Sequence, residues 1–290
     1  MRGSAIGGKT RICGVMGDLV AHSVSPAMHN AAFRELGLDY AYLPFNVGAD
    51  NLGKAVDGIR ALNLVGMNVT IPHKVAVIPL LDEVDPQAQQ IGAVNVIHNK
   101  DGRLAGSNTD AEGFLRLLEG HGINARGLRV VVLGAGGAAR AACFALASQG
   151  AVITILNRTA DKAAGCAREM AGNTGCTFEA LEMNAANLAR ALAETDLLVN
   201  ATSIGMAPGA DRSPVNSELL ERRHTVVDIV YNPVKTRLVR DAEKAGAVAI
   251  GGLDMLAWQG ALAFERWTGR AAPFDVMRRA ATRAVRSYEE

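Results

Sequence analysis

Three side chains suited to binding an anion or moving a proton fall at the ends of predicted elements: Lys74, Asn95 and Asp110. Lys74 follows an apolar strand at the expected start of a helix, where the positive end of the helix dipole disfavours a cation. A bound substrate anion would account for it, and an ordinary solvated lysine is the alternative. Asp110 falls in the first turn of another predicted helix, where its charge suits the dipole, so a structural role is also open. Because all three residues belong to one domain, we interpret them as one candidate site.

Two serines near the N-terminus form a second candidate feature. Pro26 suits the first position of a helix that continues through residues 28–36, and Ser25 would be its N-cap. Ser23, two residues earlier, would point the same way in an extended segment. Two hydroxyls beside a helix start predict a neutral cradle for a carboxylate, with a plain N-cap as the alternative.

The middle of the chain contains a strand, a glycine turn, a helix and a second strand. Residues 129–133 predict a buried strand, Gly134 a turn, residues 137–149 a helix and residues 152–156 the next strand. This is the βαβ unit of a dinucleotide-binding sheet, in which backbone N–H groups at the helix start face the pyrophosphate. Glycine turns also occur in folds that bind nothing, but the order of the elements favours dinucleotide binding.

The end of the second strand indicates which dinucleotide binds. An acidic residue there would hold the ribose 2′-hydroxyl of NAD, whereas this strand ends in Asn157-Arg158-Thr159. Arg158, with Lys162 one helical turn later, would neutralise a 2′-phosphate. The alternative is a solvated arginine beside a Thr159 N-cap. We therefore expect NADP as the cofactor rather than NAD.

The elements that position these residues predict an α/β fold with two domains. In the first domain the polar side chains of Asn68 and Thr70 share one face of a strand and need partners, and Thr109 and Glu112 have capping-box spacing. The hydrophobic pattern predicts first-domain strands at 11–16, 40–47, 64–71, 91–98 and 104–107, the last two joined by an Asp101-Gly102 turn. Further strands at 196–200, 225–233 and 247–250 and helices at 253–267 and 273–288 follow.

Composition limits the classes of function. At 290 residues and 49% hydrophobic content the chain can fill two cores, and a net charge of +1 gives no electrostatic case for nucleic acid or a membrane surface. No apolar run approaches a membrane span or a signal core, so we expect a cytoplasmic protein. The four cysteines and six histidines show no metal-ligand spacing, and no metal is expected. Residues 1–10, rich in Gly and Ser, are interpreted as a disordered lead or as a remnant added for expression.

Taken together, the motifs resemble the shikimate dehydrogenase family. The resemblance runs from about residue 11 to residue 286 and rests on His22-Ser23-Val-Ser25-Pro26, Asn68-Val-Thr70-Ile-Pro72-His-Lys74, Gly92-Ala-Val-Asn95, Asn108-Thr-Asp110, Gly134-Ala-Gly-Gly-Ala138, Asn157-Arg158-Thr159, Asn200-Ala-Thr202-Ser203, Tyr231-Asn-Pro233 and Gly251-Gly-Leu-Asp-Met255 with Gln259. It implies a discontinuous substrate domain, residues 11–110 with the returning helices of 253–290. An NADP-binding Rossmann domain, residues 111–252, would be inserted between them.

The resemblance also implies roles for individual residues. Lys74 and Asp110 would be the catalytic pair, and Ser23 and Ser25 would bind the substrate carboxylate. The other implied substrate contacts are Thr70, Asn95, Tyr231 and Gln259. The residues implied to flank NADP are Gly134, Ala135, Gly136, Gly137, Ala138, Asn157, Arg158, Thr159, Lys162, Thr202, Ile229, Gly252 and Met255. Many family members have Arg where this chain has Lys162, so how tightly this chain binds the 2′-phosphate stays open.

The implied activity is the reversible NADP-dependent reduction of 3-dehydroshikimate to shikimate in chorismate and aromatic amino-acid biosynthesis. Moving a hydride at a secondary alcohol requires a partner for the hydroxyl proton, and a lysine ammonium can donate that proton to the ketone. Whether Lys74 or Asp110 accepts it in the reverse direction stays open. Ser25 favours shikimate over quinate, since relatives acting on quinate can carry Thr there.

Two other functions stay open, a quinate or aminoshikimate-type dehydrogenase of the same fold and a catalytically silent NADP-sensing protein. Retention of both Lys74 and Asp110 argues against the sensor, which would need neither. The sequence does not fix the oligomeric state, and a homodimer is one of the states it allows.

Overall fold

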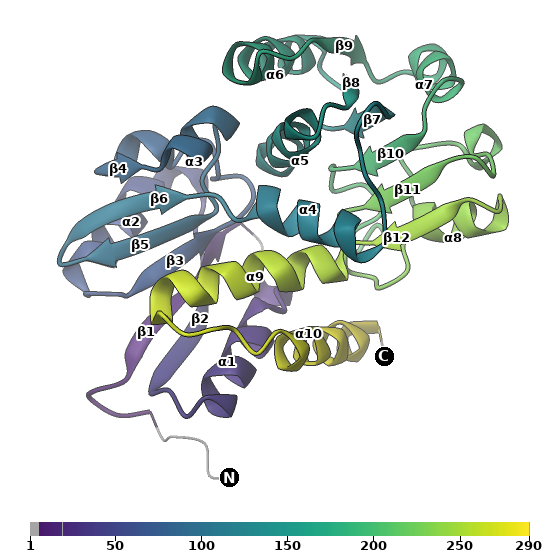
Figure 1. The fold of residues 1–290 in the computed structure, drawn as a ribbon. Coiled ribbons are helices and arrows are strands. Elements are labelled where there is room, and N and C mark those ends of the chain that lie inside the picture. Colours follow the sequence, from purple (N-terminus) through teal and green to yellow (C-terminus); the bar gives the residue numbers. More distant parts are fainter. Residues whose placement is uncertain (1–5, 19, 290) are drawn as a thin grey trace. The chain divides into compact units, whose positions relative to one another are not determined.

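The computed structural model describes residues 6–18 and 20–289 and divides the chain into two compact units. The first unit contains residues 6–18, 20–113 and 257–288, and the second contains residues 114–256. Each unit is built on its own six-stranded sheet with helices packed against it (Figure 1). The predicted two-domain α/β class is confirmed, including the return of the C-terminal helices to the first unit.

The sheet of the first unit has the strand order β2-β1-β3-β5-β6-β4. Both β2 and β3 pair with β1 in parallel, while β5 is antiparallel to β3 and β6, and β4 is parallel to β6. The bounds are β1 Arg11–Gly17, β2 Tyr40–Asn46, β3 Gly66–Val69, β4 Glu83–Val84, β5 Val96–Lys100 and β6 Arg103–Ser107. The predicted hairpin turn is confirmed, with φ of 53° at Asp101 and 86° at Gly102.

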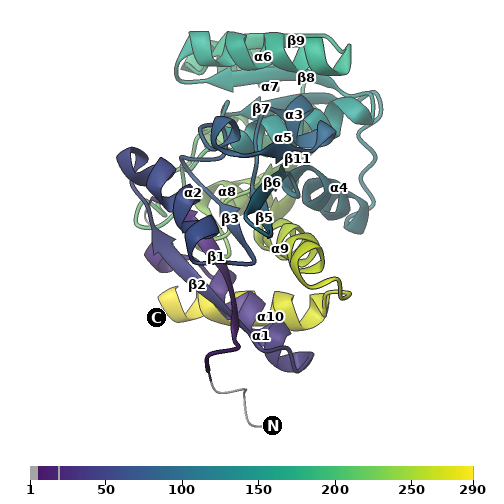
Figure 2. The ribbon, with the colours of Figure 1, turned by 90° about the vertical axis from the view of Figure 1, so that its left-hand side faces the viewer.

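Helices cover both faces of this sheet (Figure 2). Gly66 leaves room for the indole of Trp267 on one face, and Met67, the next residue, packs with Val56 and Ile59 on the other. The helices wholly within this unit are α1 Ser25–Glu35, α2 Leu52–Ala61 and α3 Pro86–Ile91, and α10 Phe274–Glu289 belongs to it through residue 288. Two more, α4 Asp110–Gly120 and α9 Leu253–Thr268, are shared with the second unit. The division of the chain into units falls within α4 and α9.

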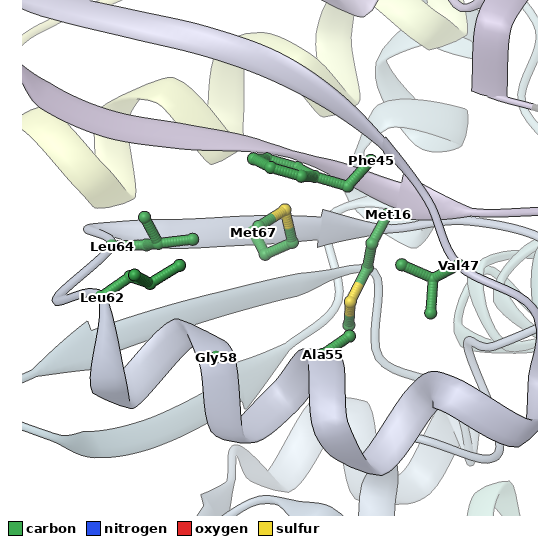
Figure 3. Close-up of a pocket in the computed structure, with 8 residues that line it drawn as sticks. All are labelled: Met16, Phe45, Val47, Ala55, Gly58, Leu62, Leu64 and Met67. Atoms are coloured by element: carbon green, nitrogen blue, oxygen red, sulfur yellow. The ribbon is translucent and has the colours of Figure 1, made fainter.

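An apolar cavity of about 160 Å³ lies between α2 and strands β1 to β3 (Figure 3). Its lining residues are Met16, Phe45, Val47, Ala55, Gly58, Leu62, Leu64 and Met67. Because successive strand residues face opposite sides, Asn68 points away from the face on which Met67 lines this cavity. The cavity therefore belongs to the core beneath α2 rather than to the face that carries Asn68.

Three local predictions about the elements of the first unit are wrong. Ser25 is the first residue of α1 rather than its N-cap, which is Val24. Lys74 lies in consecutive turns rather than at a helix start, so the argument from the helix dipole does not apply to it. The segment predicted as one strand over 91–98 contains the end of α3 at Ile91 and becomes a strand only at Val96.

A fourth wrong prediction is disorder throughout the first ten residues. Residues 7–10 form a turn in which Thr10 N–H donates to the Gly7 carbonyl oxygen at 3.1 Å. The Thr10 hydroxyl also donates to Asp39 at 2.7 Å, which attaches this turn to the residue immediately before β2. Residues 1–5 lie outside the described residues.

The sheet of the second unit is wholly parallel, with the order β12-β11-β10-β7-β8-β9. This is the doubly wound order of dinucleotide-binding domains, in which the first strand of the unit, β7, lies beside β8 and β10. The strands are β7 Arg129–Leu133, β8 Val152–Asn157, β9 Phe178–Glu182, β10 Leu197–Asn200, β11 Thr225–Asp228 and β12 Val248–Gly251. The helices are α5 Gly137–Ser148, α6 Ala160–Thr174, α7 Ala185–Leu192 and α8 Arg237–Lys244.

The central strands of the second unit are buried on both faces, as their continuous apolar runs predict. The edge strand β9, with Glu179 and Glu182, lacks such a run, and the sequence analysis missed it. Short 3-10 helices occupy Val20–His22, Ala49–Asn51, Ile78–Leu80 and Ser217–Leu219. Across residues 6–18 and 20–289, no helix has both the length and the apolar character needed to cross a membrane.

Candidate functional site

Lys74 and Asp110 form an ion pair in the first unit. Lys74 Nζ lies 2.6 Å from Asp110 Oδ2, and the two side chains are 14% and 5% exposed. The main chain of Lys74 is held where it is because its carbonyl oxygen accepts a hydrogen bond from Val94 N–H at 2.8 Å. The two residues are 36 positions apart in sequence, and the fold brings them together.

Asn95 connects this pair to its surroundings. Its Nδ2 donates to Asp110 Oδ1 at 2.8 Å and lies 3.0 Å from the Thr109 hydroxyl and 3.3 Å from Gln259 Oε1. Its Oδ1 accepts from Thr109 N–H at 2.8 Å. At 2% exposure, Asn95 is almost removed from solvent. The predicted grouping of Lys74, Asn95 and Asp110 is therefore present in the fold.

The start of α4 is capped by Asn108 rather than by the predicted capping-box threonine. Asn108 Oδ1 accepts from the N–H groups of Asp110 at 2.9 Å and Ala111 at 3.3 Å. The Thr109 hydroxyl instead lies 3.0 Å from the Gln259 carbonyl oxygen on α9. Asp110 does occupy the first turn of α4, as expected.

Gln259 reaches the cluster because α4 and α9 approach each other closely. A Cβ at Gly113 would lie 3.0 Å from Gln259 N and 3.1 Å from Gln259 Cβ, so a larger residue would push the helices apart. A polar side chain on a helix as apolar as α9 needs a hydrogen-bond partner. The structure provides Asn95 as that partner, 164 positions earlier in the chain.

Ser23 lies between the 3-10 helix Val20–His22 and α1, Ser25 is the first residue of α1, and Thr70 follows β3. Ser25 is 8% exposed, and Ser23 Oγ accepts its N–H at 3.3 Å. A Cβ at Gly17 would lie 2.3 Å from the methyl group of Thr70. In the described part of the chain, no hydrogen bond joins these three residues to Lys74 or Asp110.

The glycine turn of the second unit is shaped for a phosphate group. Gly134 has φ of +108°, and a Cβ there would lie 2.9 Å from the Ala201 carbonyl oxygen, so only glycine fits. Gly136 is the N-cap of α5 and offers no side-chain cap, and a Cβ added there would meet no atom of the described residues within 4 Å. Because no side chain caps this helix start, its backbone N–H groups can donate to the pyrophosphate of a dinucleotide. Ala135, Gly137 and Ala138 complete this turn.

The end of β8 presents exposed cations. Arg158 and Lys162 are exposed, and neither forms an ion pair within residues 6–18 and 20–289. Thr159 is the N-cap of α6, but its side chain does not cap the helix. Asn157 Nδ2 donates to the Thr159 carbonyl oxygen at 3.0 Å, which fixes the turn that carries Arg158. The arrangement fits a terminal phosphate monoester.

The remaining predicted cofactor residues follow other strands of the same sheet. The Thr202 hydroxyl donates to Asn200 Oδ1 at 2.7 Å at the end of β10. Gly252 is required after β12, because a Cβ there would lie 2.1 Å from the Ile229 carbonyl oxygen. Met255 is 3% exposed in the first turns of α9. Tyr231, predicted to bind substrate, is half-buried after β11 and belongs to the second unit.

One buried acid of the second unit was not singled out by the sequence analysis. Asp228, at the end of β11, accepts from Thr236 Oγ1 at 2.6 Å, Asn200 Nδ2 at 2.9 Å and Val230 N–H at 3.0 Å. Burial is the largest influence and raises the pKa of Asp228 to about 6, although these three donors lower it. The sequence feature that could have identified Asp228 is its place as an acid at the end of a buried strand, shortly before Tyr-Asn-Pro.

Among the described residues, no group of three His, Cys, Asp or Glu side chains could hold a metal ion.

The chain matches family models along most of its length. The model described as shikimate dehydrogenase substrate binding domain matches residues 15–97. The models described as shikimate / quinate 5-dehydrogenase and shikimate 5'-dehydrogenase C-terminal domain match residues 118–239 and 252–282.

Individual relatives agree with these matches. A protein named shikimate dehydrogenase (NADP(+)) from Methanopyrus kandleri is 49% identical over 285 residues, covering 97% of this chain and 98% of the relative. A crystal structure of a shikimate dehydrogenase in complex with NADP+ has a TM-score of 0.90 at 42% identity and covers 98% of both chains. The shikimate 5-dehydrogenase of Thermus thermophilus, in complex with NADP(H) and shikimate, has a TM-score of 0.84 at 41% identity, covering 94% of this chain and 99% of that one.

Proposed function

Because the chain belongs to the shikimate dehydrogenase family, we propose that it catalyses the reversible, NADP-dependent reduction of 3-dehydroshikimate to shikimate. The reaction serves the synthesis of chorismate and the aromatic amino acids. The family resemblance in the sequence motifs is confirmed by these comparisons. The observation that carries the chemistry is the buried Lys74–Asp110 pair, with 2.6 Å between Nζ and Oδ2.

Lys74 and Asp110 are proposed to handle the hydroxyl proton. NADP, when bound, supplies the hydride in one direction and accepts it in the other. An ammonium group has three N–H donors, and the bond to Asp110 uses one of them, so Lys74 can also donate to a ketone oxygen during reduction. In the oxidation of shikimate, the pair accepts the hydroxyl proton. Asp110 is held for this role by Asn95 at its other oxygen.

Other side chains are proposed to orient the substrate. Ser23 and Ser25, at the start of α1, would bind the substrate carboxylate through neutral hydroxyl donors. The ring hydroxyls would be contacted by Thr70, Asn95, Gln259 and Tyr231. Asn95 and Gln259 already lie within hydrogen-bonding distance of each other, which supports a shared role in orienting one hydroxyl.

The second unit is proposed to bind NADP, with residues 111–252 as the cofactor domain and residues 11–110 and 253–290 as the substrate domain. The uncapped start of α5 would bind the pyrophosphate, and Arg158 with Lys162 the 2′-phosphate. The remaining proposed cofactor contacts are Gly134, Ala135, Gly136, Gly137, Ala138, Asn157, Thr159, Thr202, Ile229, Gly252 and Met255. The absence of a carboxylate at the end of β8 supports NADP over NAD.

The cellular setting is proposed from the same features. A biosynthetic enzyme of this composition, with no membrane-crossing helix among its described residues, is expected in the cytoplasm. Its partners are small molecules, and a net charge of +1 gives no reason to expect nucleic acid. We propose a homodimer as the assembly to test by light scattering.

Mixing the purified protein with shikimate and NADP tests the proposal. Absorbance of reduced nicotinamide should appear, and should not appear when either compound is left out. A protein that binds NADP tightly but never reduces it would instead be a sensor.

Because one matching family model covers both shikimate and quinate enzymes, quinate is the second candidate substrate. Rates with shikimate and quinate, each with NADP and NAD, separate the two, and Ser25 leads us to expect shikimate with NADP to be fastest.

A further inference from the structure

A continuous series of buried hydrogen bonds leads from the core to the Lys74–Asp110 pair. The Tyr42 hydroxyl donates to Asn68 Oδ1 at 2.7 Å, and Asn68 Nδ2 donates to the Asn95 carbonyl oxygen at 3.1 Å. Asn95 Nδ2 then donates to Asp110 Oδ1 at 2.8 Å, and Lys74 lies on the other carboxylate oxygen at 2.6 Å. All five residues belong to the first unit.

Tyr42 is the fixed end of this series. It is fully buried at 0% exposure, and its main chain is held by Asn30, which accepts from Tyr42 N–H and donates to the Tyr42 carbonyl oxygen, both at 2.9 Å. The ring of His29 stacks on the Tyr42 ring at a centroid distance of 4.3 Å and an angle of 6°. Backbone, ring and hydroxyl are therefore all constrained, which makes Tyr42 a rigid support.

This support reaches Asn95 at its main-chain carbonyl oxygen, which accepts from Asn68 Nδ2. Asn95 precedes β5 by one residue, and its main chain is held by Ser107 O at 3.1 Å, by Val69 N–H at 2.9 Å and by the Asn68 amide. The Asn95 carbonyl oxygen can only accept, so Asn68 must present its NH2 group there and its oxygen to Tyr42. The Tyr42 hydroxyl satisfies that oxygen in a buried site, where an unpaired acceptor is costly.

We propose that Tyr42, acting through Asn68, is a positioning residue that sets the orientation of Asn95 and thereby of the Asp110 carboxylate toward Lys74. This inference rests on the proposed dehydrogenase function and adds to it. Tyr42 acts at three hydrogen bonds from Asp110. Its loss should therefore change the catalytic step rather than substrate affinity.

Kinetics of Tyr42→Phe in the full-length protein give the first test. The substitution removes one oxygen and keeps the ring, so the protein should fold. We expect kcat to fall about fivefold, the effect of one neutral hydrogen bond, with KM for shikimate and NADP changed less than about twofold. Tyr40→Phe is the matched control, since Tyr40 lies two residues away on β2 and should leave kcat unchanged. If the wild type is active and Tyr42→Phe has an unchanged kcat, the positioning role of Tyr42 is overturned, while the proposed dehydrogenase function stands.

A double-substitution cycle separates positioning from packing. If Tyr42 acts through Asn68, Tyr42→Phe should have no further effect on kcat in an Asn68→Ala background. An equal fold-loss in both backgrounds would mean that Tyr42 acts only by packing, and the proposal would fail.

A spectroscopic measurement keeps the test independent of turnover. The side-chain amide resonances of Asn95, assigned by their disappearance in Asn95→Ala, should shift in Tyr42→Phe and stay in place in Tyr40→Phe. Unmoved resonances would overturn the proposal whether or not the protein reduces NADP. Absent wild-type activity with shifted resonances would instead reject the proposed reaction while retaining the positioning role.

Discussion

The Lys74–Asp110 cluster of the first unit and the glycine turn of the second are both candidate binding regions, but they are constructed in opposite ways. In the first, Asn95 and Asp110 are buried, with 2% and 4% of their whole-residue surface exposed. Their polar atoms hydrogen-bond to one another and to Thr109, Gln259 and Lys74. In the second, the start of α5 has no side-chain cap. Arg158 and Lys162, after β8, are exposed.

The difference reflects what each region has to do. A group that transfers a proton must be held in one geometry before substrate arrives, because reorientation would add to the barrier. A phosphate brings its own charge and acceptors, so the protein only has to leave donors and space for it. Substitutions in the first region should therefore reduce turnover. Substitutions of the exposed Arg158 and Lys162 in the second should reduce cofactor affinity without affecting folding.

Lys74→Ala should have the largest effect and tests the first half of this comparison. Removing the proton donor should lower kcat by roughly 100-fold or more, with shikimate binding only modestly changed. Steady-state kinetics and calorimetric titration with shikimate measure the two quantities. A variant with near-normal turnover would remove Lys74 from the mechanism.

The double variant Arg158→Ala, Lys162→Ala tests the second half. Loss of both cations should raise KM for NADP by roughly 30-fold while leaving KM for NAD within about twofold, since only the 2′-phosphate loses its partners. The melting temperature should not change, because both side chains are exposed. Equal losses for both cofactors would show that the cations do not select the phosphate. The matched control is Arg168→Ala, an exposed arginine further along α6.

Burial of His29 predicts that the first unit loses stability at acidic pH. Burial lowers the pKa of His29 from 6.5 to about 3, and neither ring nitrogen has a hydrogen-bond partner among the described residues. Below pH 6.5 the unfolded chain binds this proton and the folded chain does not, so stability falls as pH decreases from 6.5 toward 3. The loss should be about 1.4 kcal/mol per pH unit.

His29→Leu should remove that part of the pH dependence, because leucine fills the buried site and has no group that titrates. Urea unfolding of both proteins at about pH 7 and about pH 5 measures it, and other titrating groups cancel in the difference. If the variant and the wild type lose the same stability between these pH values, His29 is not the group responsible.

Ser25→Ala should have the smallest effect. Loss of one hydroxyl donor should weaken shikimate binding about fivefold and leave NADP binding unchanged. Ser25 is not the N-cap of α1, so helix stability should change little. Equal weakening of both ligands, measured by titration, would argue that Ser25 acts on the fold rather than on the substrate.

The sequence by itself determined the elements whose signals are local. The strand β7, the turn at Gly134 and the helix α5 follow from adjacent residues, because an apolar run, a glycine and an alanine-rich stretch each impose their own conformation. The hairpin at Asp101-Gly102 was predictable for the same reason. The family motifs, also local, led from these elements to a two-domain dehydrogenase.

Only the tertiary structure decided the environment of the Lys74–Asp110 cluster. Local pattern predicted a helix start at Lys74 and a strand at Asn95, yet both lie in irregular backbone. Their main chains are held by residues elsewhere in the chain, Lys74 by Val94 N–H and Asn95 by Ser107 O and Val69 N–H. Their side chains meet partners still further away, Lys74 meeting Asp110 at 36 positions and Asn95 meeting Gln259 at 164. A polar group buried in a core takes the conformation that satisfies its hydrogen bonds. Those partners are chosen by how strands and helices meet, which no short stretch of sequence contains.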